Sequence, residues 1–524
     1  MRLFHFMQPR VVEALSAAVS KVHISFDGWT TKGGKRGFFG IIAHFADAAG
    51  VIRDLPIDLP QLQGSHSGER IAETVKRTLE TYGIFPSKLG YFVLDNATNN
   101  DTAVAAIARL YDFNAAHRRL RCGPHTLNLI GQVIIFGKNK EAYDNAAEEH
   151  ASEQAFMAQW RRDGPLGVLM DVINYIKTPQ QYELFADFQR LANRALPTHD
   201  RLKILEPVKP VVTRWNSFYC SFERAAHLHA AYDSYASHHI RAIAAADAHA
   251  ISKGNKLPDA PAWMRSDGLS AGDWAVITQY MEALKPLKHA TERLEGRGKT
   301  SNFSAIYEII PVFEYLLSSL ESIASPYAHV NFNAHAEAPE DHLPINIRAA
   351  WHKANEYYGK LDSSPVYYAA VCLHPYYKYY CDNSWRDKAS WLDAANAGFQ
   401  RLWAEYKPLQ VPPARPKTMA PSSIDEAISA FVDGGSADVS DIDEFERWKK
   451  YEPKWTKEQY LEEGNPVKYW IKLRQKYTNL AQFAIDIMTI PASSCDCERM
   501  FSELGDLLEP VSYTHLTLPT ILRV

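Results

Sequence analysis

Apolar and polar positions over residues 22–62 follow the period of β-strands. Val22–Trp29 alternates apolar with polar residues, and Phe38–Asp47 and Val51–Leu62 follow as two further strands after short turns. Short connections between consecutive strands are typical of an antiparallel meander. A short helix is expected before them, over 11–20.

From residue 67 onward the pattern alternates between helix and strand. Apolar residues at four-residue spacing predict a helix from about Ser67 to Gly83. Leu89–Leu94 is apolar on both faces, as in a buried strand. A second helix follows, then a short strand over 118–122 and a helix over 125–137. Strands mixed with helices in this order indicate an α/β fold.

Two acids stand at the ends of predicted strands. Asp27 lies near the end of the first strand, and Asp95 directly follows Leu89–Leu94. Asp and Asn favour turns and helix N-caps, so capping of the next helix is one interpretation of Asp95. The other is an acid that a ligand can reach. The two carboxylates meet if the fourth strand pairs beside the first, although spacing alone does not order the sheet.

Composition describes an ordinary globular protein with more than one domain. The chain has 524 residues, 46% of them hydrophobic, and a net charge of −4. A chain that is not basic overall needs local basic patches to bind nucleic acid. Six cysteines without paired CxxC motifs favour a reducing intracellular compartment. No apolar run has the length of a transmembrane helix, and the first ten residues do not form a signal peptide.

The rest of the chain divides by composition. Helical patterns dominate 151–406, and 407–440 is rich in Pro, Ser, Gly and Asp, as flexible linkers are. Residues 441–508 contain an apolar helical stripe, and the tail over 509–524 does not continue it. A stripe of this kind is usually core.

Seven motifs occur in a fixed order along the chain. They are SFDGWT (25–30), VLDNATNN (93–100), CGPH (122–125), VVTRWNS (211–217), LKPLKHATERLEG (284–296), YYAAVCLHPYYK (367–378) and IPASSCDCERMFSELGD (490–506). In this order they resemble the hAT superfamily of transposases, named for hobo, Activator and Tam3, and its fungal members most. Each motif is modest alone, whereas their joint order is specific.

The resemblance implies a ribonuclease-H-like core over 21–150, built on a mixed five-stranded sheet. It also implies a large all-α insertion over 151–406 and a C-terminal dimerisation region over 441–508 that includes the last core helix. The family commonly carries an N-terminal BED zinc finger. No Cys/His pairs precede Asp27, so residues 1–20 are expected to be a truncated lead-in.

The activity that the resemblance implies is DNA transposition, by metal-dependent strand cleavage and transfer at element ends. Asp27, Asp95 and Glu498 match the family's acidic triad. Carboxylates suit this chemistry, because two Mg²⁺ or Mn²⁺ ions stabilise the attacking and leaving oxygens of an in-line displacement. Among nearby acids, Asp496 is the main alternative to Glu498, and a solvated helix face is its ordinary interpretation.

Five residues are candidates for contacting DNA. Arg119, Arg121 and Lys35 are placed to meet phosphate, and a solvated surface is the alternative for each. Arg214 and Trp215 match the family's RW motif, in which the Trp is implicated in stabilising a flipped base. A core Trp at the start of a helix is the alternative interpretation.

Two further sets complete the candidate residues. Cys122 and His125 match the family's C/D-x-x-H motif, and they either shape the catalytic pocket or form a buried structural pair, because two ligands do not complete a zinc site. The candidates for dimerisation are Tyr469, Trp470, Leu473, Tyr477 and Phe501.

The resemblance implies DNA and a second copy of the chain as partners, a nuclear location, and no membrane. A second function is also open. A domesticated or decayed transposase-derived protein would dimerise and bind DNA or proteins without catalysis.

Overall fold

The computed structural model describes residues 2–30, 37–62, 67–137, 164–194, 196–211, 214–296, 305–331, 343–407, 443–497 and 499–501. The chain divides into two compact units. Unit 1 comprises Met1–Pro124, Arg293–Ile310 and Leu361–Val524, and unit 2 comprises His125–Glu292 and Pro311–Lys360. Each unit therefore combines segments that are distant in the sequence.

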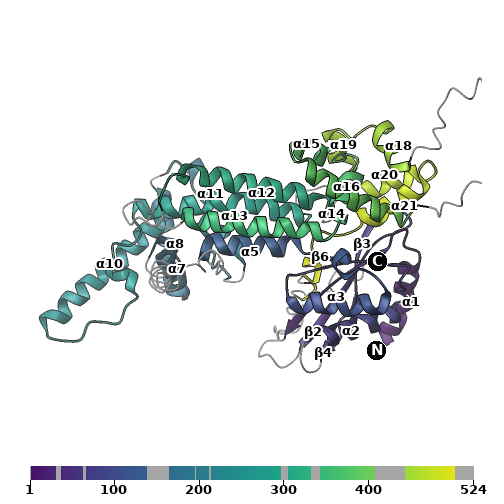
Figure 1. Ribbon diagram of the computed structural model, residues 1–524. Coiled ribbons are helices and arrows are strands. Elements are labelled where there is room, and N and C mark those ends of the chain that lie inside the picture. Colours follow the sequence, from purple (N-terminus) through teal and green to yellow (C-terminus); the bar gives the residue numbers. More distant parts are fainter. Residues whose placement is uncertain are drawn as a thin grey trace, which may run out of the picture. The chain divides into compact units, whose positions relative to one another are not determined.

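Unit 1 is built on a mixed sheet with the strand order β3-β2-β1-β5-β6 (Figure 1). Its strands are β1 (Val22–Thr30), β2 (Gly37–Ala46), β3 (Ile52–Asp58), β5 (Leu89–Leu94) and β6 (Arg119–Arg121), and the short β4 (Gln61–Leu62) pairs with β2. β1, β2 and β3 are antiparallel, whereas β5 lies parallel to both β1 and β6. The mixed five-stranded sheet predicted from the sequence is confirmed.

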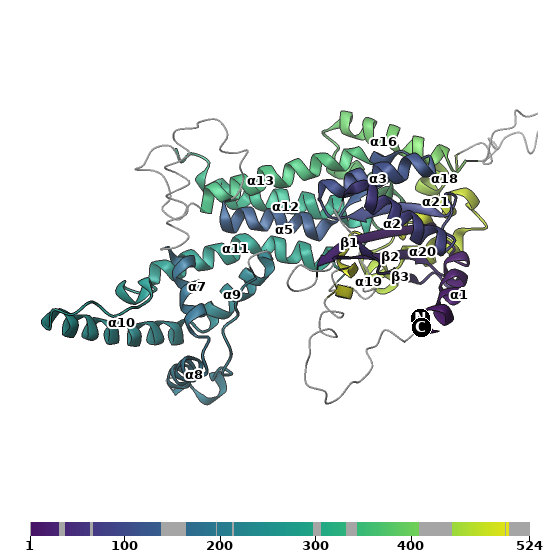
Figure 2. The same ribbon diagram turned by 90° about the horizontal axis from the view of Figure 1, so that it is seen from below.

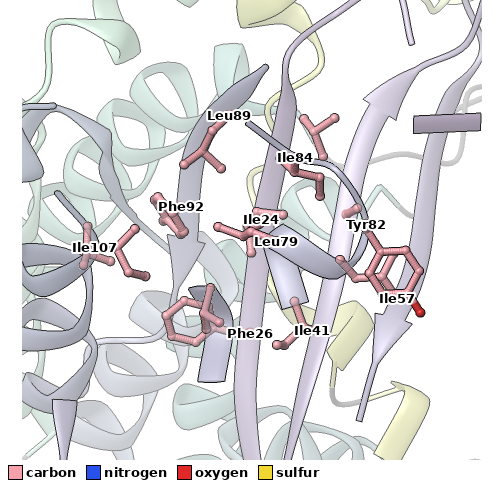
Figure 3. Close-up of a cluster of buried hydrophobic side chains, with 14 of the residues drawn as sticks. Ile24, Phe26, Ile41, Ile57, Leu79, Tyr82, Ile84, Leu89, Phe92 and Ile107 are labelled. Atoms are coloured by element: carbon pink, nitrogen blue, oxygen red, sulfur yellow. The ribbon is translucent and has the colours of Figure 1, made fainter. Parts of the chain in front are cut away.

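Three helices cover one face of this sheet. They are α1 (Arg2–Ser16), α2 (Gly68–Thr81) and α3 (Thr98–Tyr111). Leu79 and Ile107 from these helices join Phe26 and Phe92 from the strands in one buried cluster (Figure 3), to which α1 contributes Leu15. Burial of such side chains is worth about 1.5–3 kcal/mol each, so this cluster contributes strongly to the stability of the sheet.

The first helix differs from its expected range of 11–20. It ends at Ser16, because the residues after it already pair with the end of β2. The Val19 N–H donates to the Ala46 carbonyl at 2.9 Å, and the Ala46 N–H donates to Ser20 Oγ at 2.9 Å. A short helix, α4 (Ala115–Arg118), lies just before β6 and was not predicted.

The other face of the sheet packs against the C-terminal part of unit 1, and His23 is the principal polar link. Its Nε2 lies 2.9 Å from the Asp486 carbonyl oxygen and 3.0 Å from Thr489 Oγ1, at the end of α21 (Thr478–Met488). The Tyr91 N–H donates to His23 Nδ1 at 3.1 Å. One buried imidazole therefore joins β1, β5 and α21.

A β-bulge in β5 stands opposite this histidine. The β1–β5 register shifts by one residue there, so that Gly90 and Tyr91 both face His23. A Cβ on Gly90 would lie 2.3 Å from His23 Nδ1, far inside van der Waals contact. The bulge therefore depends on a residue without a side chain.

The unfolding free energy is expected to depend on pH through His23. Burial holds the pKa of the His23 imidazole at about 3, against an ordinary 6.5. Since the unfolded imidazole binds a proton below pH 6.5 and the folded one does so only near pH 3, stability is full above pH 6.5 and falls as the pH is lowered through this window. The slope is at most about 1.4 kcal/mol per pH unit.

Urea denaturation between pH 7 and pH 4 measures this slope, and His23→Gln is the reference because glutamine does not titrate. The wild-type slope should exceed that of the variant. Parallel slopes would show that His23 is not the group responsible.

The remaining helices of unit 1 follow the sheet in sequence. They are α14 (Val366–Leu373), α15 (Tyr380–Ser384), α16 (Ala389–Ala404), α18 (Glu444–Tyr451), α19 (Lys457–Glu463), α20 (Pro466–Leu473) and α21. The linker predicted over 407–440 lies, apart from its first residue, outside the described residues.

The described part of unit 2 is helical. It contains most of α5 (Gly123–Phe136), α11 (Ala271–Leu294) and α12 (Ile309–Ala324), and all of α7 (Pro165–Tyr175), α8 (Pro179–Arg194), α9 (Trp215–His227), α10 (His229–Ser252) and α13 (Leu343–Gly359). Helices α5, α11, α12 and α13 run alongside one another (Figures 1 and 2). Within the described residues, no helix is both long and apolar enough to span a membrane.

Candidate functional site

Two acids lie at the carboxyl ends of neighbouring parallel strands in unit 1. Asp27 is within β1, and Asp95 directly follows β5. Beyond the bulge Ile24 pairs with Phe92, and three further residues along each strand lead to Asp27 and Asp95. The residue that the bulge adds therefore brings the two acids level. In the register before the bulge, Asp27 would be level with the apolar Leu94.

The carboxylate of Asp95 is oriented by its own turn. Its Oδ1 accepts hydrogen bonds from the Ala97 N–H at 3.0 Å and from Asn100 Nδ2 at 2.6 Å. The N-cap of α3 is Ala97, so Asp95 lies two residues before the capping position. The Asp27 carboxylate accepts a hydrogen bond from the Gly28 N–H at 2.7 Å. Both side chains are half-buried.

Arg119 holds the backbone that carries Asp95. Its guanidinium donates to the carbonyl oxygens of Leu94 and Asp95, and its Nε donates to Asp101 Oδ1 at 2.9 Å. The side chain is only 7% exposed, and burial lowers the pKa of Arg119 while the Asp101 carboxylate opposes that shift. In this conformation Arg119 positions the acidic turn, and it does not present its guanidinium to phosphate as the sequence suggested.

Arg121 is the more accessible of the two arginines. It donates to Asn96 Oδ1 at 3.0 Å, lies 3.5 Å from the Asp101 carboxylate, and is 28% exposed. Its backbone N–H donates to the Tyr367 hydroxyl at 3.0 Å. A phosphate contact close to Asp95 therefore remains open to Arg121.

The third acid of the expected triad, Glu498, lies outside the described residues. The helical residues around it, 495–497 and 499–501, form what we call the C-terminal helical segment. It packs on the sheet beside Asp27, because Gly40 pairs with Asp27 and a Cβ on Gly40 would lie 2.3 Å from Met500 Cε. The Phe501 and Trp29 rings stack 6.0 Å apart.

Asp496 does not lie on a solvated helix face, the ordinary interpretation of this residue. Its side chain is 23% exposed and pairs with Arg499 at 2.7 Å. Burial, and next the neighbouring Asp54 carboxylate, raise the pKa of Asp496, whereas His44 and Arg499 oppose that shift. Asp496 thus belongs to a polar cluster with β2 and β3.

Cys122 and His125 fall in different units. Cys122 is buried at the end of β6, where its Sγ accepts a hydrogen bond from the Ser494 N–H at 3.3 Å. The Gly123 N–H donates to the Ala492 carbonyl at 2.8 Å. The structural alternative therefore describes Cys122, which attaches β6 to the residues before the C-terminal helical segment. His125 is half-buried in α5.

The RW motif starts α9 in unit 2. Arg214 is its exposed N-cap residue, and the Trp215 N–H donates to Asn128 Oδ1 at 3.1 Å. The Trp215 ring is 2% exposed and fills the space above Gly131, where a Cβ would lie 2.4 Å from Trp215 Cγ. The core alternative describes this Trp, and no base can stack on it in this conformation. Lys35 lies outside the described residues.

The five candidates for dimerisation contribute largely to the core of their own chain. Trp470, Tyr477 and Phe501 are buried, while Tyr469 and Leu473 are half-buried. The Trp470 indole N–H donates to the Leu373 carbonyl at 3.0 Å, and the Tyr477 hydroxyl donates to Glu452 at 2.9 Å. An apolar helical stripe is usually part of the core of its own chain, and these side chains are already buried or half-buried in a single copy.

Sequence reasoning missed two partners of this region, His44 and Asp54. Both come from the meander, and Ser25, which precedes Asp27 by two residues, contacts His44. A signal was present, because His23, Ser25 and His44 interrupt strands whose remaining residues are mainly apolar. Polar residues inside such strands need hydrogen-bond partners, so they point to a polar network.

Comparisons with known proteins find three similarities. Residues 444–515 match the hAT family C-terminal dimerisation region, and residues 25–119 match the ZBED1 RNase-like domain. The chain is also 21% identical over 520 residues to tpeD, a proposed transcriptional regulator of Talaromyces stipitatus. That alignment covers 95% of this chain and 52% of tpeD, so the chain spans about half the length of this relative.

Proposed function

We propose that this chain, in which residues 444–515 match the hAT family C-terminal dimerisation region and residues 25–119 match an RNase-like domain, is a transposase-derived protein that cleaves and transfers DNA strands with the help of metal ions. The substrate class is a DNA phosphodiester at the ends of a mobile element. The protein acts in the nucleus as a dimer or a higher oligomer, assembled through residues 444–515.

The observation that supports this proposal best is that Asp27 and Asp95 stand opposite each other in the register of two neighbouring parallel strands. Two half-buried carboxylates on neighbouring parallel strands hold a fixed separation, because the sheet is rigid and the surrounding turn is bonded to Arg119. The C-terminal helical segment, in which Glu498 lies, packs beside the strand that carries Asp27. Asp27 and Asp95 thus come from distant parts of the sequence to one end of the sheet, and the described residues on either side of Glu498 pack next to this end.

These residues fit divalent metal ions. Carboxylate oxygens are the ligands that Mg²⁺ and Mn²⁺ prefer, and Asp95 is held by bonds to Oδ1 that fix its orientation. Bound at Asp27, Asp95 and Glu498, two such ions would stabilise the attacking and leaving oxygens of the displacement. Arg121, partly exposed beside Asp95, is the residue that we expect to bind the neighbouring phosphate.

Where inverted repeats flank the gene, strand cleavage on DNA that carries them tests the proposal. Purified full-length chain should cut the end of the repeat with Mg²⁺ or Mn²⁺, and EDTA should remove the activity. A scrambled repeat of equal length is the control substrate. Cleavage that persists in EDTA would contradict a metal-dependent reaction.

The name of one relative favours a second candidate function. Because tpeD is described as a transcriptional regulator, a protein of this type that binds DNA without cutting it is the alternative. The same repeats separate the two functions. Specific, salt-sensitive binding without cleavage in either metal would favour regulation over transposition.

A further inference from the structure

Unit 1 contains a second group of metal-ligating side chains, away from the acid pair. His44 on β2, Asp54 on β3 and Asp496 in the C-terminal helical segment each offer one ligand atom, and these atoms all lie within 4.8 Å of one another. His44 and Asp54 are directly opposite in the β2–β3 register. Two adjacent strands and a segment distant in sequence thus converge on one point.

The imidazole of His44 is held in a fixed orientation. Its Nε2 lies 2.9 Å from Ser25 Oγ, and its Nδ1 lies 2.6 Å from Asp54 Oδ1. The side chains of Ser25 and His44 are fully buried. When Nε2–H donates to Ser25, the Nδ1 lone pair is directed at the carboxylates. A hydrogen-bonded second nitrogen of this kind is a common feature of histidines that bind metal ions.

The charge and the access of the cluster suit a dication. In the forms that bind a metal ion, two carboxylates and a neutral imidazole, the ligands carry a charge of about −2, and Arg499, which pairs with Asp496, compensates only part of it. The Asp54 side chain is 36% exposed and that of Asp496 is 23% exposed, so an ion and a water ligand can enter from one side. One imidazole nitrogen with two carboxylate oxygens is a donor set for Zn²⁺ or Mn²⁺, whereas Mg²⁺ favours oxygen alone.

We propose that His44, Asp54 and Asp496 bind one first-row transition-metal dication, for which Zn²⁺ is the reference ion. The ion attaches the C-terminal helical segment to β2 and β3. Asp496 precedes Glu498 by two residues, so the ion limits the movement of the segment that bears the third acid of the triad. The site itself does not depend on the proposed function.

Zinc binding to the full-length chain, stripped of metal by a chelator, is the first test. Isothermal titration should give one tight Zn²⁺ site, and Asp54→Asn and Asp496→Asn should each weaken it by tenfold or more. Asp47→Asn removes an acid from the β2–β3 turn, outside the cluster, and should leave the affinity unchanged. Retained affinity in both cluster variants would overturn the proposal, and would leave an ordinary hydrogen bond as the explanation of the contact between His44 and Asp54.

Two alternative zinc sites need their own controls. Asp95→Asn tests the acid pair, and Cys495→Ser tests the thiol next to Asp496. Neither should change the affinity for Zn²⁺, and a loss in either would place the ion elsewhere. Co²⁺ gives a spectroscopic check, since binding to imidazole and carboxylates produces ligand-field bands without a thiolate charge-transfer band.

Hydrogen exchange tests the attachment of the C-terminal helical segment. Zn²⁺ should slow amide exchange over 495–501 by about tenfold in the wild type and not in Asp54→Asn. Equal protection with and without Zn²⁺ would overturn the attachment. These measurements use no DNA, so failure of the zinc site and failure of strand cleavage are separate results.

Discussion

Asp95→Asn is expected to lower metal-dependent strand cleavage by about 10³-fold or more, which corresponds to the several kcal/mol that bound metal ions contribute to such a transition state. Asparagine has the size of aspartate, and its carbonyl oxygen can accept the hydrogen bonds that Ala97 and Asn100 donate. The change therefore removes a negative charge while it leaves the turn in place. Single-turnover cleavage in Mg²⁺, beside urea denaturation, separates activity from stability.

Asp112→Asn is the matched control. Asp112 is an exposed acid at the other end of α3, in the left-handed region at φ 53°, which asparagine tolerates well. Its cleavage rate should stay within about twofold of the wild type, as expected for a surface change away from the site. Wild-type cleavage by Asp95→Asn would remove Asp95 from the metal centre.

Gly90→Ala is expected to lower the unfolding free energy by about 2–3 kcal/mol, at the upper end of the range for overpacking. The new methyl group would lie 2.3 Å from His23 Nδ1 and 2.7 Å from Cε1. His23 cannot move aside without breaking its bonds to Tyr91 and to Asp486. The substitution therefore strains the bulge. It also disturbs the β1–β5 register that places Asp27 opposite Asp95.

Gly28→Ala is the control for Gly90→Ala, because the nearest atom to its Cβ is a Phe39 ring carbon at an ordinary 3.7 Å. It should change stability by less than about 0.5 kcal/mol. A double-mutant cycle with His23→Ala adds a sharper test, since the clash disappears with the ring and Gly90→Ala should then cost much less. Additive effects would exclude His23 as the source of the strain.

The strands of unit 1 and its two strand-end acids were predictable because each rests on a local pattern. Alternation predicted β1, and a continuous apolar run predicted β5. The same run concealed the bulge, since Leu89–Leu94 has no alternation from which a register can be read. Gly90 is the one residue of this run without an apolar side chain. A glycine is required there because His23, from β1, occupies the space of a Cβ.

Whether a motif residue faces solvent or core was not predictable from the motif. Arg119 and Arg121 look equivalent in the sequence and lie on the same face of β6, yet the bonds of Arg119 to the Leu94 and Asp95 carbonyls bury it, whereas Arg121 stays partly exposed. Trp215 is buried for a similarly non-local reason, because Gly131 on α5 leaves room for its ring. Asp496 acquired its surroundings from β2 and β3, hundreds of residues earlier, which no local pattern can report.

The bond between His23 and Asp486 spans 463 residues, and this separation has a consequence for biosynthesis. At about 5–20 residues per second, roughly 25 to 90 s pass between the two during translation. All segments of unit 2 have been synthesised once Lys360 is added. At that point one face of the sheet in unit 1 still lacks the C-terminal helices that pack on it. The nascent chain therefore exposes a partly apolar β-surface for much of its synthesis, and we expect co-translational chaperones to bind this surface.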